Sequence, residues 1–162
     1  RDELIGQLPM LKKNFVSYAR FSQVRSIEDL FEGLKLPAMQ VRKAFELRSG
    51  TFINKENTFD FKPFPPEAQF SPVQDLEIVN INNDDLPDIV IVGNFFGAVS
   101  AFGKYDASGG MVITGQGEGK FEFREFLSIP DQNSYRHIRF IEDDLLVISN
   151  NGKSLLLKFV GK

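Results

Sequence analysis

The chain has 162 residues, of which 42% are hydrophobic and 25% charged, and its net charge is −3. This composition is typical of one soluble globular domain, and without a basic cluster it argues against nucleic-acid binding. The absence of cysteine excludes a disulfide framework and thiol chemistry. No apolar run approaches the roughly 20 residues of a membrane span.

The sequence begins at Arg1-Asp2-Glu3, without a methionine and without a signal peptide. We therefore expect a fragment of a longer protein, whose targeting segment lies outside this sequence. The lack of cysteine fits an extracytoplasmic protein that is secreted, periplasmic or exposed at the outer surface.

Residues 1–35 predict a short helical segment. Pro9 is tolerated in a first helical turn and predicts the start of a second helix. Ser26 to Asp29 has the form of a capping box. We expect two or three short helices that cover one end of the β region or form a separate helical module, and a break near residues 33–37. Apolar residues recur at the three- and four-residue steps of a helical face: Leu4, Leu8, Leu11, Phe15 and Tyr18.

Residues 36–162 predict a mainly β region. From Val41 onward, short apolar runs alternate with turn residues, as in antiparallel sheets. Asn151-Gly152 indicates a tight hairpin between the last two runs. The expected strands are 45–47, 51–53, 59–64, 76–80, 88–93, 111–115, 121–126, 136–141, 145–149 and 154–160.

The β region contains an internal repeat. Residues 52–61 align with residues 114–123 at an offset of 62, and each copy reads as a strand, a polar turn and a Phe-x-Phe strand. The offset suits one four-stranded propeller blade, although it is longer than the ~40–50 residues of common blades. The chain then holds one whole blade and parts of two others, too few for a closed ring.

The stretch from Asn80 to Asp88 predicts a cation site between two strands. Side-chain oxygens stand at relative positions 1, 3, 5 and 9, and the backbone carbonyl at position 7 completes the set. Ca²⁺ takes six to eight such oxygens. An EF-hand is excluded because the flanks read as strands and position 12 is Ile91. The alternative is a metal-free polar turn held by Asx hydrogen bonds. The predicted ligands are Asn80, Asn82, Asp84, Leu86 and Asp88.

This stretch resembles the calcium loop of FG-GAP or VCBS repeats, which form the blades of integrin-α-like β-propellers. Two residues depart from that pattern. Asn80 stands at position 1, where the family has Asp, so the loop offers two carboxylates instead of three. Asp85 stands at position 6, where the family has Gly because the backbone takes a positive φ; Asp tolerates that conformation better than most residues.

The resemblance covers nearly the whole chain. Residues 1–15, 93–97 and 105–108 are similar to the C-terminal region of large Bacteroidetes VCBS-repeat proteins, many of which also carry an ASPIC/UnbV-type module. It implies a mainly β fold of incomplete, propeller-like antiparallel blades with a short N-terminal helical segment. It implies no assigned chemistry.

The segment 94–110 is a second candidate site. It is long for a blade connection and rich in glycine, and long loops on a rigid β scaffold often carry binding residues. Exposed aromatic rings beside Asn and Asp suit the recognition of a glycan or a protein. Alternatively, the aromatic residues pack the loop onto the sheet. The candidate ligand-binding residues are Asn94, Phe96, Tyr105, Asp106 and Ser108.

Other motifs are read as structural. The glycine-rich run 115–120 lacks the spacing of a phosphate loop and leads into a strand. His137 is the only histidine, so a zinc site is excluded and a Ser-His-Asp triad is not expected. The acidic run 142–144 is typical of a solvated turn.

These observations predict a non-enzymatic, Ca²⁺-supported binding or scaffold module of a secreted or cell-surface protein. Its expected partners are a protein or a glycan and the rest of the parent chain. The first alternative is an accessory region of a larger glycan-processing enzyme whose active site lies outside this fragment. The second is a glycan hydrolase, which requires two carboxylates in one cleft, one with a raised pKa.

Overall fold

The computed structural model describes residues 1–34, 42–130 and 132–158. The chain forms two compact units, Arg1–Phe45 and Glu46–Lys162, and each is described by itself. The start of the β region expected at residue 36, and most of the break expected at 33–37, lie outside the described residues.

The described part of the N-terminal unit contains four short helical elements, namely α1 (Asp2–Gln7), the 3₁₀ helix η1 (Pro9–Lys13), α2 (Tyr18–Phe21) and α3 (Ile27–Leu30). Pro9 opens η1, as predicted. The capping box is confirmed: the Ser26 hydroxyl accepts from the Asp29 backbone N–H, and the Asp29 carboxylate accepts from the Ser26 N–H.

The expected apolar face is only partly present in this unit. Leu11 and Phe15 are buried, and the Phe15 ring meets Phe21 edge-on at 5.5 Å. Tyr18 is exposed instead. Its ring lies against the Arg1 guanidinium, and its hydroxyl donates to Asp2. Because α1 gives way to a 3₁₀ helix at Pro9, the α-helical spacing does not continue to Tyr18.

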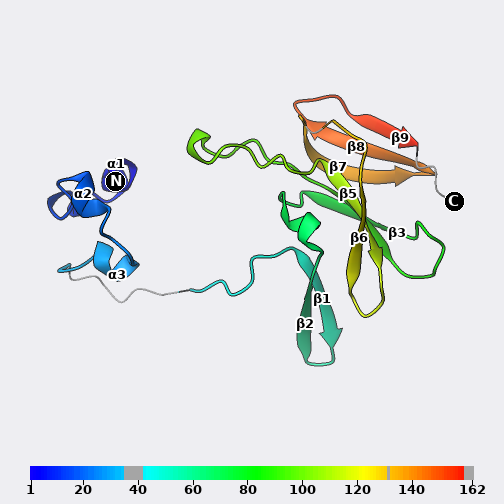
Figure 1. Ribbon diagram of the computed structural model, residues 1–162, viewed down its shortest axis with the longest axis horizontal. Coiled ribbons are helices and arrows are strands. Elements are labelled where there is room, and N and C mark those ends of the chain that lie inside the picture. Colours follow the sequence, from blue (N-terminus) through cyan, green and yellow to red (C-terminus); the bar gives the residue numbers. More distant parts are fainter. Residues whose placement is uncertain (35–41, 131, 159–162) are drawn as a thin grey trace. The chain divides into compact units, whose positions relative to one another are not determined.

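The second unit is mainly β, as predicted, and all of its strand pairs are antiparallel (Figure 1). The described strands form a two-stranded sheet β1-β2, a four-stranded sheet β3-β4-β5-β6 and a three-stranded sheet β7-β8-β9. They are β1 (Gly50–Lys55), β2 (Thr58–Pro63), β3 (Asp75–Val79), β4 (Asp88–Val92), β5 (Gly110–Gly115), β6 (Phe121–Phe126), β7 (Ser134–Ile141), β8 (Asp144–Asn150) and β9 (Leu155–Lys158), with short 3₁₀ helices η2 (Pro66–Gln69) and η3 (Ser100–Phe102).

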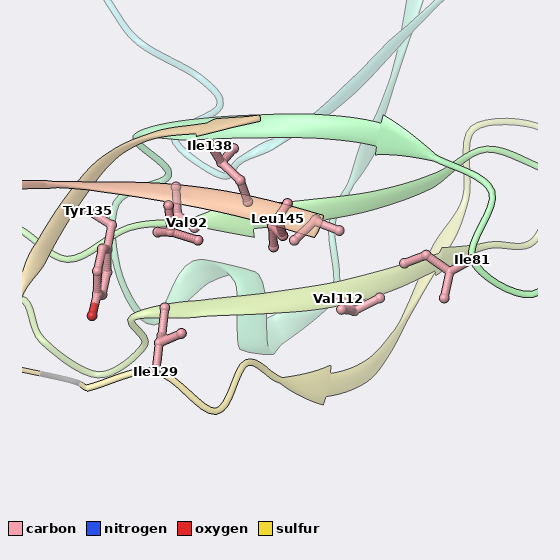
Figure 2. Close-up of a cluster of buried hydrophobic side chains, with 9 residues drawn as sticks. Ile81, Val92, Val112, Ile129, Tyr135, Ile138 and Leu145 are labelled. Atoms are coloured by element: carbon pink, nitrogen blue, oxygen red, sulfur yellow. The ribbon is translucent and has the colours of Figure 1, made fainter. Parts of the chain in front are cut away.

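Strand β4 is the centre of the core because it is buried on both faces. Successive side chains of a strand point to opposite faces. Val90 and Val92 therefore join a cluster shared with β7 and β8. Figure 2 shows Val92 of this cluster beside Tyr135, Ile138 and Leu145, between the two sheets.

The opposite face of the four-stranded sheet has a cluster of its own. Ile89 and Ile91 of β4 pack there with Met111 and Ile113 of β5, under Phe64 and Ala68 of the segment that follows β2. The four-stranded sheet is thus covered on both sides, which explains why β4 and β5 read as nearly continuous apolar runs.

The strand expected at residues 45–47 is wrong. Residues 42–47 have no regular structure, and Phe45 is 91% exposed. The Glu46 carboxylate instead accepts hydrogen bonds from the backbone N–H groups of Leu47 and Arg48 and from the Arg48 guanidinium. These local bonds occupy the polar groups that a strand would offer to a partner.

The two segments that align in the sequence each form a β-hairpin, although the turn has two residues in the first and five in the second. Residues 52–61 span β1 and β2, and residues 114–123 span β5 and β6. The two hairpins also touch, since the Thr51 hydroxyl donates to the Gly119 carbonyl at 2.9 Å. The hairpins β1-β2 and β5-β6 are therefore in contact through this bond.

Candidate functional site

The predicted cation loop, residues 80–88, connects β3 and β4. Two of the predicted ligands, Asn82 and Asp84, are in contact, and their bonds are the Asx hydrogen bonds expected for the metal-free alternative. The Asn82 amide donates to Asp84 Oδ2 at 2.6 Å, and Asp84 Oδ1 accepts from the Leu86 backbone N–H at 2.9 Å. Asn80, Asn82 and Asp84 are all exposed, so a cation from solvent can reach them.

Asp88 differs from the other predicted ligands because it is fully buried. Its Oδ2 accepts from the Ile81 backbone N–H at 2.7 Å, and its Oδ1 accepts from the Gly115 N–H at 2.9 Å. One carboxylate thus joins the start of the loop to the end of β5. Asp88 therefore holds the loop in place through its own two hydrogen bonds.

The loop backbone takes the positive φ that the resemblance implies at position 6. Asp85 has φ +61° and Asn83 has φ +57°. Asn and Asp are the non-glycine residues that adopt this conformation most readily. Asp85 therefore fits a position where the family has Gly.

The donor atoms of this loop are oxygens, which a hard cation such as Ca²⁺ prefers. Within the described residues, no three His, Cys, Asp or Glu side chains are grouped as a metal site. The loop instead combines the Asp84 and Asp88 carboxylates with two amides and one backbone carbonyl. Asn82 presents its amide nitrogen to Asp84, so cation binding requires this exposed side chain to turn its oxygen inward.

The second candidate segment forms an arm that extends from the sheets (Figure 1). Phe95 and Tyr105 pair across the arm through two backbone hydrogen bonds of 2.8 and 3.0 Å. The short helix η3 lies between them in the sequence. The arm is therefore an ordered hairpin at its base.

Two of the predicted ligand-binding residues lie inside the base of this arm. Asn94 is fully buried, and its Oδ1 accepts from the Ser71 hydroxyl at 3.1 Å and from the Ser108 N–H at 3.2 Å. Its amide nitrogen donates to the Asn133 carbonyl at 3.3 Å. Ser108 is also buried, and among the described residues its hydroxyl has no hydrogen-bond partner. Both residues hold the arm against the sheets.

The other three predicted residues lie farther along the arm. Tyr105 and Asp106 are exposed. Phe96 is partly buried, and the Lys104 ammonium lies 5.3 Å from its ring centroid. Of the five, Phe96 lines a hollow formed by described residues.

That hollow, of about 370 Å³, lies between the arm and the ends of β7 and β8. Sequence reasoning missed most of its lining, which comes from residues 132–136 and 150–151. The Asn150-Asn151-Gly152 run indicated only a turn, and nothing in the sequence places that turn beside Phe96. Besides Phe96, the lining includes Gln132, Asn133, Arg136, Asn150 and Asn151.

His137 does not contribute to this hollow. It is exposed on β7, and its Nδ1 lies 3.4 Å from Asp75 Oδ2. The same Asp75 oxygen accepts from the Ile138 backbone N–H at 3.2 Å. The His137–Asp75 contact therefore belongs to the contact between β3 and β7.

No protein-family model, curated protein or solved structure matches this chain. In the described residues, no helix is long and apolar enough to span a membrane.

Proposed function

We propose that this chain is a non-enzymatic, Ca²⁺-supported binding or scaffold module of a secreted or cell-surface protein, and that it recognises a glycan or a protein. The observation that carries this proposal is the exposed Asx loop 80–88, whose buried Asp88 ties it to β5. A cation held there acts on the stability of the sheet. The arm and its hollow supply the binding face.

We also propose that the sheets are arranged as in an incomplete β-propeller. Side-chain contacts between β3 and β7 join Gln74 to Arg136, Asp75 to His137 and Glu77 to Arg139. Each pair is separated by 62 residues, which is the offset of the repeat. This equality supports the proposal, because equivalent positions of adjacent blades lie side by side when blades are related by rotation about one axis.

The proposed ligands for Ca²⁺ are the side-chain oxygens of Asn80, Asn82, Asp84 and Asp88 and the Leu86 carbonyl. The ion supplies a positive charge that offsets the repulsion between carboxylates and fixes the loop. Amide oxygens are weaker donors than carboxylates, so we expect a Kd near that of extracellular modules, about 10⁻⁴–10⁻³ M.

Thermal melting in chelator and in Ca²⁺ tests this proposal. At a roughly 100-fold excess of Ca²⁺ over Kd, binding adds about 2.7 kcal/mol to the free energy of unfolding. For a domain of this size we expect the melting temperature to rise by about 5–10 °C. Asp84→Asn should remove most of that rise, and Asn80→Asp should enlarge it.

Asp85→Asn is the matched control, because it removes the same charge from the same loop at a position outside the ligand set. It should retain most of the Ca²⁺ effect. Equal melting temperatures with and without Ca²⁺, together with no heat of binding in calorimetry, would leave the loop as a metal-free turn. Hydrolysis of glycan, ester or peptide substrates by the purified chain would contradict the non-enzymatic assignment.

A further inference from the structure

The hollow at the base of the arm offers many unused hydrogen-bonding groups. The side-chain amides of Gln132, Asn150 and Asn151 line it and make no hydrogen bond to other described residues. Each amide carries both a donor and an acceptor. This combination matches the hydroxyl groups of a sugar, which both donate and accept.

One wall of the hollow is formed by the side chain of Arg136. Arg136 is partly buried, and within the described residues no carboxylate lies within ion-pair distance of it. Its guanidinium donates to the neutral Gln74 amide and lies 5.6 Å from the Phe95 ring centroid. These two contacts hold the planar group in place, and most of its five N–H donors have no acceptor among the described residues.

Near Arg136, an aromatic ring and a second cation also shape the chemistry of the hollow. Phe96 lines the hollow and offers a ring face, against which the C–H face of a sugar can pack. The Lys104 ammonium lies over one face of that ring, 5.3 Å from its centroid. No carboxylate is among the described residues that line the hollow, so its charge favours an anionic ligand.

We propose that this hollow binds an acidic sugar residue, a hexuronate. Arg136 receives the carboxylate through paired N–H bonds, the amides of Asn150 and Asn151 bind hydroxyl groups, and Phe96 packs on the ring. The volume of about 370 Å³ lies at the small end of ligand sites and suits one or two sugar units. This assignment rests on the proposed binding function and names its ligand class.

Binding of a hexuronic-acid disaccharide and of its carboxyl-reduced counterpart, measured by calorimetry or ligand-observed NMR, tests the assignment. The two probes differ only in the acidic group. The chain should bind the acid at least about tenfold more tightly, since hydrogen bonds to a charged group are the stronger kind. Arg136→Gln should abolish this preference, and Arg136→Lys should keep part of it.

Arg139→Gln is the matched control, because it makes the same change on the same strand at a residue that does not line the hollow. It should retain the preference. Asn150→Ala should weaken the binding of both sugars by a similar factor. If Arg136→Gln does not fold, Arg136→Lys replaces it in the test. A reduced preference of Arg136→Lys for the acidic sugar then supports the assignment, and an unchanged preference contradicts it.

Three results would overturn the assignment: equal binding of the two sugars, equal effects of the Arg136 and Arg139 substitutions, or no binding of either sugar. The melting experiment separates this failure from that of the proposed function. A chain that Ca²⁺ stabilises but that binds neither sugar refutes the hexuronate site and leaves the calcium-supported scaffold standing. A chain that prefers the acidic sugar but is not stabilised by Ca²⁺ supports the hexuronate site and refutes the calcium-supported scaffold.

Discussion

Asp88 and Asp84 belong to the same loop but are expected to affect stability differently. Asp88→Ala leaves the buried N–H groups of Ile81 and Gly115 without an acceptor, so we expect a loss of about 3 kcal/mol even in chelator. Asp84→Ala changes an exposed side chain and should cost less than about 1 kcal/mol in chelator. Urea unfolding measures both values. Equal losses in chelator would show that Asp88 has no structural role of its own.

Glu46 provides a pH-dependent test of local structure. Hydrogen bonds from the Arg48 side chain are the main cause that lowers its pKa from 4.5 to about 2. A lowered pKa means that this interaction is complete above about pH 4.5 and is lost as the pH falls toward 2. Because the carboxylate is exposed, the effect on global unfolding should be small.

NMR titration of the Glu46 side chain should find the midpoint near pH 2. In Arg48→Gln the midpoint should return toward 4.5. A midpoint near 4.5 in the unmodified chain would show that the pair does not form in solution.

At the scale of elements, the contact between the repeat hairpins can be tested at Gly119. A Cβ there would lie 2.1 Å from Ile53 Cδ1, and the residue has φ +72°. Gly117 has a similar φ of +77° but open space around it. Gly117→Ala should cost only about 1 kcal/mol of backbone strain, and Gly119→Ala should cost clearly more in urea unfolding.

Ile53→Ala in the Gly119→Ala background should recover the excess, because it removes the atoms that clash. Equal costs for the two glycine substitutions would mean that the hairpins do not touch in solution.

The sequence predicted elements well where the pattern is local. Strands such as 88–92 follow from β-branched runs, and the Ser26 capping box follows from residue spacing alone. Residues 45–47 show the limit of such patterns, because an apolar alternation becomes a strand only when a partner strand is available. The strand pattern could not reveal that Glu46 bonds its own neighbours.

The two candidate sites also differ in whether their contacts are local in the sequence. The Asx hydrogen bonds among Asn82, Asp84 and Leu86 are local, so residue spacing was sufficient to suggest them. The hollow joins Phe96, Arg136 and Asn151, which only tertiary packing brings together. For the same reason, the sequence could not distinguish the buried Asn94 from the exposed Asp106 on the arm.

At the scale of the whole molecule, the described part of residues 46–162 is a stack of unequal sheets. The four-stranded sheet is covered on both faces. The hairpin β1-β2 is a sheet of only two described strands, and isolated two-stranded sheets are marginally stable. Its outer edges offer unpaired backbone groups to another chain.

We expect weak, concentration-dependent association through this hairpin. Phe52 and Phe59 are 66% and 70% exposed, and their rings meet edge-on at 6.5 Å. Burial of two such rings contributes about 1.5–3 kcal/mol each, which is sufficient for a weak dimer but not for an obligate one. Sedimentation velocity over a range of concentrations should show the average mass rising above that of a monomer.

Replacing both Phe52 and Phe59 by Thr keeps strand propensity and removes the apolar surface, so this variant should remain a monomer. Ile78→Thr removes an exposed apolar side chain from β3 and should associate like the unmodified chain. A monomer at every concentration, or association that survives the double substitution, would contradict an interface on this hairpin. Loss of association in both variants would show instead that general surface hydrophobicity drives it.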